Sequence, residues 1–204
     1  MKKIAIVDYD AGNMGSVQKA FEYLGQRVVV TREPQEIMGA EGVVLPGVGA
    51  FGDAMEKLQH YRLTDVIGQA VESGKPFLGI CLGLQLLFES SEESAGVKGL
   101  SLLKGKILRI PEEQGLKIPH IGWNSLELSP GTKLFQGLPE KPFVYFVHSY
   151  YLRAENAADV AAVTEYGTKI HAAVERGNLF ACQFHPEKSG ETGLAILKNF
   201  IGLL

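Results

Sequence analysis

One short segment restricts the possible folds more than any other, because an apolar run ends at a cysteine that lies between two glycines. The run Phe77–Ile80 leads into Cys81, and Gly79 and Gly83 flank the cysteine before a helical pattern begins. This order of strand, sharp turn and helix is that of a nucleophile elbow with sulfur in place of oxygen. The N–H of Leu82, directly after the cysteine, can then face a developing oxyanion. The segment predicts that Cys81 projects from the carboxyl end of a strand, although a buried structural cysteine remains the alternative on this motif alone.

A second pattern, near the other end of the chain, supplies a base and a carboxylate. The strand-like run Asn178–Phe184 leads directly into His185, Pro186 and Glu187. Because proline holds this stretch extended, we expect His185 and Glu187 to project to the same side. A cysteine nucleophile needs a base, and the base needs a carboxylate that fixes its tautomer and stabilises the imidazolium. Together with the elbow, this favours a catalytic triad of Cys81, His185 and Glu187 over three unrelated structural residues.

The other histidines and the second cysteine are weaker candidates. His60 lies in a charged, polar stretch, and His120 and His171 have no carboxylate two residues away, so we expect all three to be structural or exposed. His148 ends a strand-like run and has nothing nearby to orient it, which favours a contact with a substrate or a partner. Cys182 is isolated within the last strand and is expected in the core. No grouping has the ligand spacing of a zinc site, so no metal is predicted.

Length and charge agree with a compact enzyme domain. With 204 residues the chain can bury a sizeable core, and it fits one domain, residues 1–204, rather than two. A formal net charge of -3 gives no basic surface for nucleic acid or for an anionic membrane. The use of only two cysteines argues for a reducing cytoplasm over a disulfide framework. Neither a signal peptide nor an apolar run of membrane-spanning length is recognisable, so we expect a cytoplasmic protein.

Strands alternate with helices in the first half of the chain. The expected strands are residues 3–7, 28–31, 43–45 and 77–80, and the expected helices are 16–24, 34–38 and a segment around 63–71. This alternation predicts right-handed crossovers and a mainly parallel sheet. Beyond an elbow helix at 82–89, we expect shorter extended pieces at 106–110, 144–148, 160–165 and 170–174, and a last helix at 192–201. The predicted fold is therefore a three-layer, flavodoxin-like α/β fold with a mixed, mainly parallel sheet flanked by helices.

The glycine-rich segment Gly47–Gly52 formally satisfies the dinucleotide-binding pattern G-x-G-x-x-G. It follows the third expected strand rather than the first, and no acidic residue ends a strand about 20 positions on, where a ribose would need it. The glycines of Pro46–Gly49 are better explained by a backbone that passes close to Cys81. An acyl-transfer site needs two N–H donors and the elbow supplies one, so we expect this turn to provide the second. A plain tight turn is the alternative.

Three of these motifs together resemble those of the class I, or triad, glutamine amidotransferases. They are Pro46–Gly49, Gly79–Gly83 with Gln85, and His185–Glu187. Four further segments are similar to the glutaminase subunits of imidazole glycerol phosphate synthases: Asp8–Ser16, His120–Asn124, Tyr145–Tyr150 and His185–Ser189. The resemblance spans essentially the whole chain. It implies an enzyme without a cofactor, in which Cys81 attacks the side-chain amide of glutamine and ammonia is released.

The resemblance also implies roles for individual residues. Leu82 and either Val48 or Gly49 would supply the N–H groups of the oxyanion hole. The implied substrate contacts are Gly47, Gln85, Glu93, His148, Ser149 and Tyr150. Three residues of this chain are similar to positions that face the partner subunit in that family: Trp123, Tyr145 and Lys188.

The partner that the resemblance implies is a cyclase subunit with a (β/α)8 barrel, in a heterodimer. Free ammonia is quickly protonated in water, so it needs a dry route to its acceptor. The cyclase would use it to make imidazole glycerol phosphate and AICAR in histidine biosynthesis. On the residues alone, two other functions stay open: another cysteine-dependent amidase, such as a peptidase or γ-glutamyl hydrolase, and a non-catalytic flavodoxin-like binding module with an inert Cys81.

Overall fold

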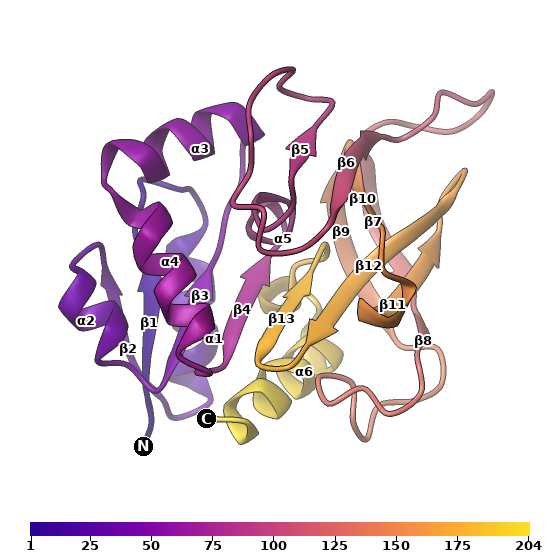
Figure 1. Cartoon of the computed structure of the whole chain (residues 1–204). Coiled ribbons are helices and arrows are strands. Elements are labelled where there is room, and N and C mark those ends of the chain that lie inside the picture. Colours follow the sequence, from indigo (N-terminus) through magenta and orange to yellow (C-terminus); the bar gives the residue numbers. More distant parts are fainter.

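The computed structural model describes residues 1–204 and is built on an eight-stranded sheet in the order β2-β1-β3-β4-β13-β12-β11-β8 (Figure 1). The parallel part consists of β2 (Arg27–Thr31), β1 (Lys3–Val7), β3 (Gly42–Leu45), β4 (Phe77–Ile80) and β13 (Leu179–Cys182). The antiparallel part consists of β12 (Lys169–Arg176), β11 (Val160–Glu165) and β8 (Glu127–Leu128). The predicted mixed, mainly parallel sheet is therefore confirmed.

Helices cover both faces of the parallel strands. The side chains of Ala5 and Val7 pack with α2 (Pro34–Met38), α3 (Phe51–His60) and α4 (Leu63–Glu72). Those of Ile4 and Ile6 pack on the opposite face with α1 (Met14–Tyr23) and α6 (Gly190–Gly202), as Figure 1 shows. Because both faces are buried, these strands read as continuous apolar runs rather than alternating ones. The three-layer prediction is confirmed. No helix is both long and apolar enough to span a bilayer.

Two helices differ from the prediction. The elbow helix α5 (Leu82–Leu86) ends before the predicted Glu89, because the chain must extend at β5 (Ser90–Ser91) to pair with β6 (Gly105–Arg109). Helix α3 was not predicted, since its first residues were assigned to the glycine-rich turn. The buried side chains of Phe51, Ala54, Met55 and Leu58 recur at helical spacing and were the signal for it.

Two small sheets lie beside the antiparallel strands of the main sheet (Figure 1). One has the order β10-β6-β5, with β10 at Tyr150–Ala154, and the other pairs β7 (His120–Ser125) with β9 (Phe143–His148). Strands β7 and β10 were not predicted. In β7 the glycine and asparagine weaken the strand signal, and β10 follows β9 after the single residue Ser149, so that only the first of the two was recognised.

Candidate active site

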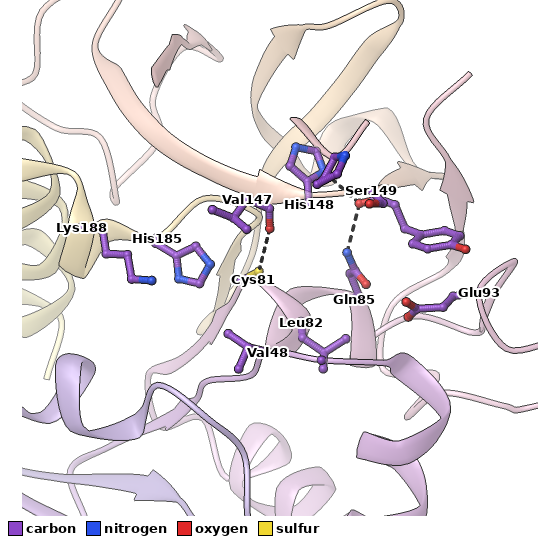
Figure 2. Close-up of a pocket in the computed structure, with 13 residues that line it drawn as sticks. Val48, Cys81, Leu82, Gln85, Glu93, Val147, His148, Ser149, His185 and Lys188 are labelled. Atoms are coloured by element: carbon purple, nitrogen blue, oxygen red, sulfur yellow. Dashed lines mark hydrogen bonds between the residues drawn. The ribbon is translucent and has the colours of Figure 1, made fainter. Parts of the chain in front are cut away.

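Cys81 lies in the sharp turn between β4 and α5, where the sequence predicts the elbow (Figure 2). Its backbone angles, φ 56° and ψ -109°, are rare for a residue with a side chain. Close packing on both sides enforces this turn. A Cβ on Gly83 would lie 1.8 Å from the carbonyl oxygen of Leu45, and one on Gly79 would lie 2.9 Å from that of Gly83. The two glycines therefore allow the approach that holds the thiol at the carboxyl end of β4.

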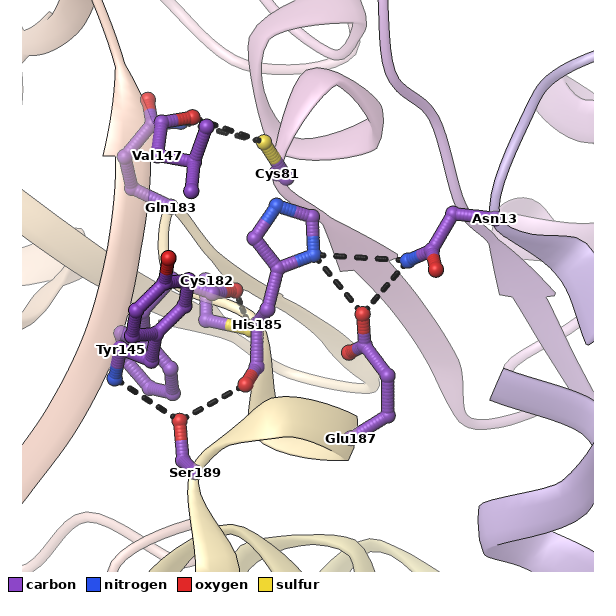
Figure 3. Close-up of polar contacts among 10 residues, drawn as sticks. Asn13, Cys81, Tyr145, Val147, Cys182, Gln183, His185, Glu187 and Ser189 are labelled. Atoms are coloured by element: carbon purple, nitrogen blue, oxygen red, sulfur yellow. Dashed lines mark hydrogen bonds and ion pairs between the residues drawn. The ribbon is translucent and has the colours of Figure 1, made fainter. Parts of the chain in front are cut away.

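His185 and Glu187 meet beside Cys81, and the imidazole lies between the thiol and the carboxylate (Figure 3). The Nδ1–H of His185 donates to Oε1 of Glu187 at 2.8 Å, and the two side chains are 2% and 0% exposed. With the proton on Nδ1, Nε2 is free for the thiol. The predicted extended conformation is wrong, because Pro186–Lys188 form a turn of 3₁₀ helix. This turn, begun by proline at its first position, brings Glu187 back under the ring.

The two cysteines have different electrostatic surroundings. Burial by itself would lower the pKa of His185, but its hydrogen bonds and charge interactions with Cys81 and Glu187 outweigh burial and raise that pKa to about 10. The imidazole beside Cys81 is therefore held in its charged form at neutral pH. Burial raises the pKa of the Cys182 thiol well above its ordinary value, and this thiol lies 3.5 Å from the carbonyl oxygen of Phe184. The predicted core position of Cys182 is confirmed.

A buried pair of glutamines supports the thiol from the other side. Nε2 of Gln183 donates to Sγ of Cys81 at 3.7 Å, and Nε2 of Gln85 donates to Oε1 of Gln183 at 3.0 Å and to the carbonyl of Tyr150 at 3.1 Å. The thiol itself lies 3.9 Å from the carbonyl oxygen of Val147 (Figure 3). Sequence reasoning missed Gln183. A polar residue within the apolar run that leads into His185 was the available signal.

A cavity of about 290 Å³ opens at Cys81. In Figure 2, Gln85 and Glu93 lie on one side of the cysteine and His185 and Lys188 on the other. The predicted site residues that line this cavity are Val48, Gly49, Cys81, Leu82, Gln85, Glu93, His148, Ser149, Tyr150, His185 and Lys188. Pro119 and Val147 also line it and were not predicted. The volume is close to the lower end of the range for small-ligand pockets.

The glycine turn after β3 lies against the elbow in one particular orientation. The N–H of Leu82 donates to the carbonyl of Gly47 at 3.3 Å. Because the C=O and N–H of a trans peptide point in opposite directions, the N–H of Val48 faces away from Leu82. Gly47 itself does not line the cavity. It packs closely against Tyr9, because a Cβ on Gly47 would lie 2.3 Å from the Tyr9 hydroxyl. In this orientation the two expected oxyanion donors do not converge.

The prediction that nothing orients His148 is wrong. Its Nδ1–H donates to the carbonyl of Tyr150 at 2.9 Å, so its Nε2 accepts from Nδ1 of His120 at 3.0 Å. His120 is stacked on Tyr166, with ring centroids 3.8 Å apart. Burial lowers the pKa of His148 to about 3 and that of His120 to about 4, so both rings are neutral near pH 7. The pairing of β7 with β9 places the two rings together, and the sequence did not reveal that pairing.

The remaining predicted residues lie around or outside the cavity. Glu93 Oε2 accepts from the N–H of Phe51 at 2.7 Å, at the start of α3. Trp123 and Tyr145 lie outside the cavity on the β7–β9 pair, with ring centroids 6.0 Å apart. No three histidine, cysteine or acidic side chains gather in a way that could hold a metal ion.

Comparison with known proteins gives concordant matches in sequence. The family model described as "Glutamine amidotransferase class-I" matches residues 5–203. The chain is 54% identical to the imidazole glycerol phosphate synthase subunit HisH of Thermosynechococcus vestitus, over 98% of this chain and 97% of that protein. It is 52% identical to the subunit of the same name from Moorella thermoacetica, over 98% and 94%.

Solved structures with the same fold are more distant in sequence. A protein described as a glutamine amidotransferase superposes with a TM-score of 0.76 at 20% identity, covering 98% of this chain and 97% of that one. PurLQS from Thermotoga maritima superposes with a TM-score of 0.76 at 23% identity, covering 99% of each chain. These likenesses show the fold alone.

Proposed function

We propose that residues 1–204 form one glutaminase domain. This chain belongs to the class-I glutamine amidotransferases and, within them, to the HisH subunits of imidazole glycerol phosphate synthase. The domain hydrolyses L-glutamine to glutamate and ammonia and passes the ammonia to a cyclase subunit in histidine biosynthesis. The observation that carries this function is the buried arrangement of Cys81, His185 and Glu187 at the cavity.

The proposed reaction has two halves that use the same base. The thiolate of Cys81 attacks the carboxamide carbon of glutamine, and the imidazolium of His185 gives its Nε2 proton to the departing ammonia. A γ-glutamyl thioester remains on Cys81. His185 then takes a proton from water, and the resulting hydroxide displaces the thiolate and releases glutamate. Glu187 accepts from Nδ1 throughout and stabilises the imidazolium each time it forms.

The cavity wall offers groups that match the ends of glutamine. Both N–H bonds of the Gln85 amide are used by Gln183 and Tyr150, which leaves the Gln85 carbonyl oxygen for a substrate N–H. Glu93 uses Oε2 at the start of α3, which leaves Oε1 for the substrate ammonium. His148, Ser149 and Tyr150 also line the cavity. Neutral His148 does not repel the ammonium.

The proposed docking surface for the cyclase is the outer face of β7 and β9. Ile121 pairs with Val147 and Trp123 with Tyr145, so their side chains share one face. On this face Trp123 is 55% exposed, an unusual position for so large an apolar group. Val147 belongs to this face and also lines the cavity. Ammonia released at Cys81 can therefore enter the interface directly, where a (β/α)8-barrel cyclase would receive it to form imidazole glycerol phosphate and AICAR.

The orientation of the Gly47–Val48 peptide supports control by the partner. Rotation of this peptide would turn the Val48 N–H toward the oxyanion and release the N–H of Leu82 as the second donor. The oxyanion hole proposed for Leu82 with Val48 or Gly49 therefore belongs to a second state of the turn. The cyclase, and the nucleotide bound to it, would activate the enzyme by binding that state preferentially.

The test is steady-state glutamate release by the chain alone, with the cyclase, and with the cyclase plus its nucleotide ligand. We expect little turnover in the first condition and an increase of at least about 10²–10³-fold across the series, since one oxyanion donor typically contributes that much and the rotation supplies two. Glutamate release without any response to the cyclase would favour a free-standing amidase. No release in any condition would leave a binding module.

A further inference from the structure

The segment Asp8–Ser16 has a distinctive sequence but no role in the chemistry described so far. Its Asn13 reaches the triad: Nδ2 donates to Oε1 of Glu187 at 2.6 Å, on the same oxygen that accepts from His185 (Figure 3). The side chain of Glu187 is completely buried, and its Oε2 has no hydrogen-bond partner. Asn13 is therefore the one donor besides His185 that this carboxylate has.

The proton positions show which bond Asn13 makes. Nδ2 of Asn13 also lies 3.5 Å from Nδ1 of His185, but Nδ1 carries the proton that goes to Glu187, so this approach is between two donors. The amide donates to the carboxylate instead. A short hydrogen bond to a carboxylate oxygen is directional, and it fixes Oε1 in line with the Nδ1 proton.

Asn13 makes this contact in place of the one that its position favours. It precedes α1 as the N-cap, where asparagine usually accepts a hydrogen bond from the first turn, yet its side chain makes no capping bond. Its φ of 70° is left-handed, a conformation that asparagine tolerates better than most residues. The helix thus gives up a stabilising cap, and the amide is turned toward Glu187.

The loop that carries Asn13 is anchored by contacts that do not involve the triad. Arg32 binds Asp8 and Asp10, each at 2.7 Å, from the end of β2. The hydroxyl of Tyr9 donates to the carbonyl of Pro46 at 2.7 Å, at the start of the glycine turn. The loop is therefore held against the sheet independently of the triad, which allows Asn13 to fix Glu187 rather than follow it.

We propose that Asn13 is a positioning residue that holds the Glu187 carboxylate aligned with Nδ1 of His185, and through it fixes the orientation and charge of the imidazole. Its contribution to turnover rests on the proposed glutaminase function. Its effect on His185 and on the reactivity of Cys81 does not require glutamine.

The test compares two variants with the wild-type chain. Asn13→Gly removes the amide and keeps a residue suited to positive φ. With the cyclase present, we expect this variant to lower kcat for glutamate release about 10- to 100-fold, with KM for glutamine unchanged because Asn13 does not line the cavity. In the chain alone, we expect an NMR titration to show a lower pKa for His185 and iodoacetamide to alkylate Cys81 more slowly at pH 7.

Asn13→Asp keeps the shape of the side chain but replaces the N–H donor by a carboxylate oxygen. Near neutral pH this carboxylate competes with Glu187 for the Nδ1 proton, whereas its protonated form at lower pH donates to Glu187 again. We expect the kcat defect to shrink toward pH 5. His185 and Cys182 both interact with Glu187, and neither the charged imidazole nor the buried thiol changes state in this range. This variant also carries the test if Asn13→Gly does not fold.

The matched control is Asn178→Asp, which removes amide bonds to the carbonyls of Val71 and Lys75, both 2.8 Å, at the amino end of β13. It should lose stability without changing the pH profile or the His185 titration. Unchanged kcat and His185 pKa in Asn13→Gly, or an effect confined to KM, would overturn the proposal. A wild-type complex that releases no glutamate would refute the proposed function instead, and the titration and alkylation would still decide the role of Asn13.

Discussion

The proposed triad and the glycine turn meet at Cys81, but only the side chains of the proposed triad are already arranged for the reaction. After the end of β13, the side chains of His185 and Glu187 are joined by a 2.8 Å hydrogen bond and are almost fully buried. At the end of β3, the carbonyl of Gly47 occupies the N–H of Leu82, and Val48 is 40% exposed. The proposed nucleophile and base are therefore aligned in the isolated chain, whereas the proposed oxyanion donors are not.

The difference follows from what holds each part. The triad side chains are fixed by packing and by buried partners from several elements, so their arrangement costs nothing further at the moment of reaction. The turn is a short backbone segment between glycines, and Gly49 has a φ of 104° that few other residues adopt. Peptide rotation there is inexpensive. A site of this kind can keep its reacting side chains rigid while a single movable hydrogen-bond donor controls its activity.

The largest expected effect comes from breaking the assembled part. Cys81→Ala or His185→Ala should reduce glutamate release by the activated complex about 10³-fold or more, since loss of a nucleophile or its base disables the whole triad. Glu187→Gln should cost less, because the base remains. Rates are measured under saturating glutamine with the cyclase and its ligand. Near-wild-type turnover in Cys81→Ala would remove the basis for the triad.

A somewhat smaller effect is expected from blocking the movable part. Val48→Pro deletes the N–H that the rotated peptide would present, so it should remove most of the partner-dependent rise, about 10²–10³-fold, while the complex still forms. Val48→Ala keeps the N–H and is the matched control. Turnover is compared with and without the cyclase, and binding is measured separately. Full stimulation of Val48→Pro would contradict control through this peptide.

Alkylation separates the two parts without glutamine. Iodoacetamide needs a reactive thiol but no oxyanion hole, so it should label Cys81 in the isolated chain, and Val48→Pro should change that rate by less than about threefold. Cys182 should remain unlabelled because its buried thiol stays protonated. Mass spectrometry after timed reaction gives both rates. Equal labelling of the two cysteines would show that the surroundings of Cys81 do not activate it.

The smallest effect concerns the neutral histidine pair behind the cavity wall. The pKa values of His120 and His148 are lowered from 6.5 to about 4 and about 3, so between these values and pH 6.5 the unfolded chain binds more protons than the folded one. The free energy of unfolding should therefore fall as the pH drops from 6.5 toward 4. His120→Phe should weaken this pH dependence, but it should cost about 1–3 kcal/mol at pH 7 because Nε2 of His148 loses its donor.

Urea unfolding at pH 7.5 and pH 5 measures this effect. His60→Gln, at an exposed position on α3, serves as the control and should keep the wild-type dependence on pH. If His120→Phe lost stability in acid as steeply as the wild type, the neutral pair would not be its source.

Most of the parallel half was predictable, because its strands are apolar runs buried on both faces. The proximity of Cys81, His185 and Glu187, on which the proposed triad rests, was predictable too, since the elbow and the His-Pro-Glu segment each follow the end of a strand. The two small sheets were predicted less completely: strands β7 and β10 were missed, and with β7 the pairing that joins His120 to His148. Strand pairing is a long-range property, and short mixed strands carry little local signal of it.

The amino-acid sequence alone was enough to predict most strands and helices of the parallel half, to propose the nucleophile, base and carboxylate, and to indicate the family. These depend on local patterns: glycines around one cysteine, a proline between a histidine and a glutamate, and runs of apolar residues. Three contacts became visible only in the tertiary structure. Asn13 donates to Glu187, Gln183 donates to Cys81, and the N–H of Leu82 donates to the Gly47 carbonyl. Those facts depend on which way a side-chain amide and one peptide point. Neither direction is encoded locally, because the groups that fix it lie on strands and loops far away in the chain.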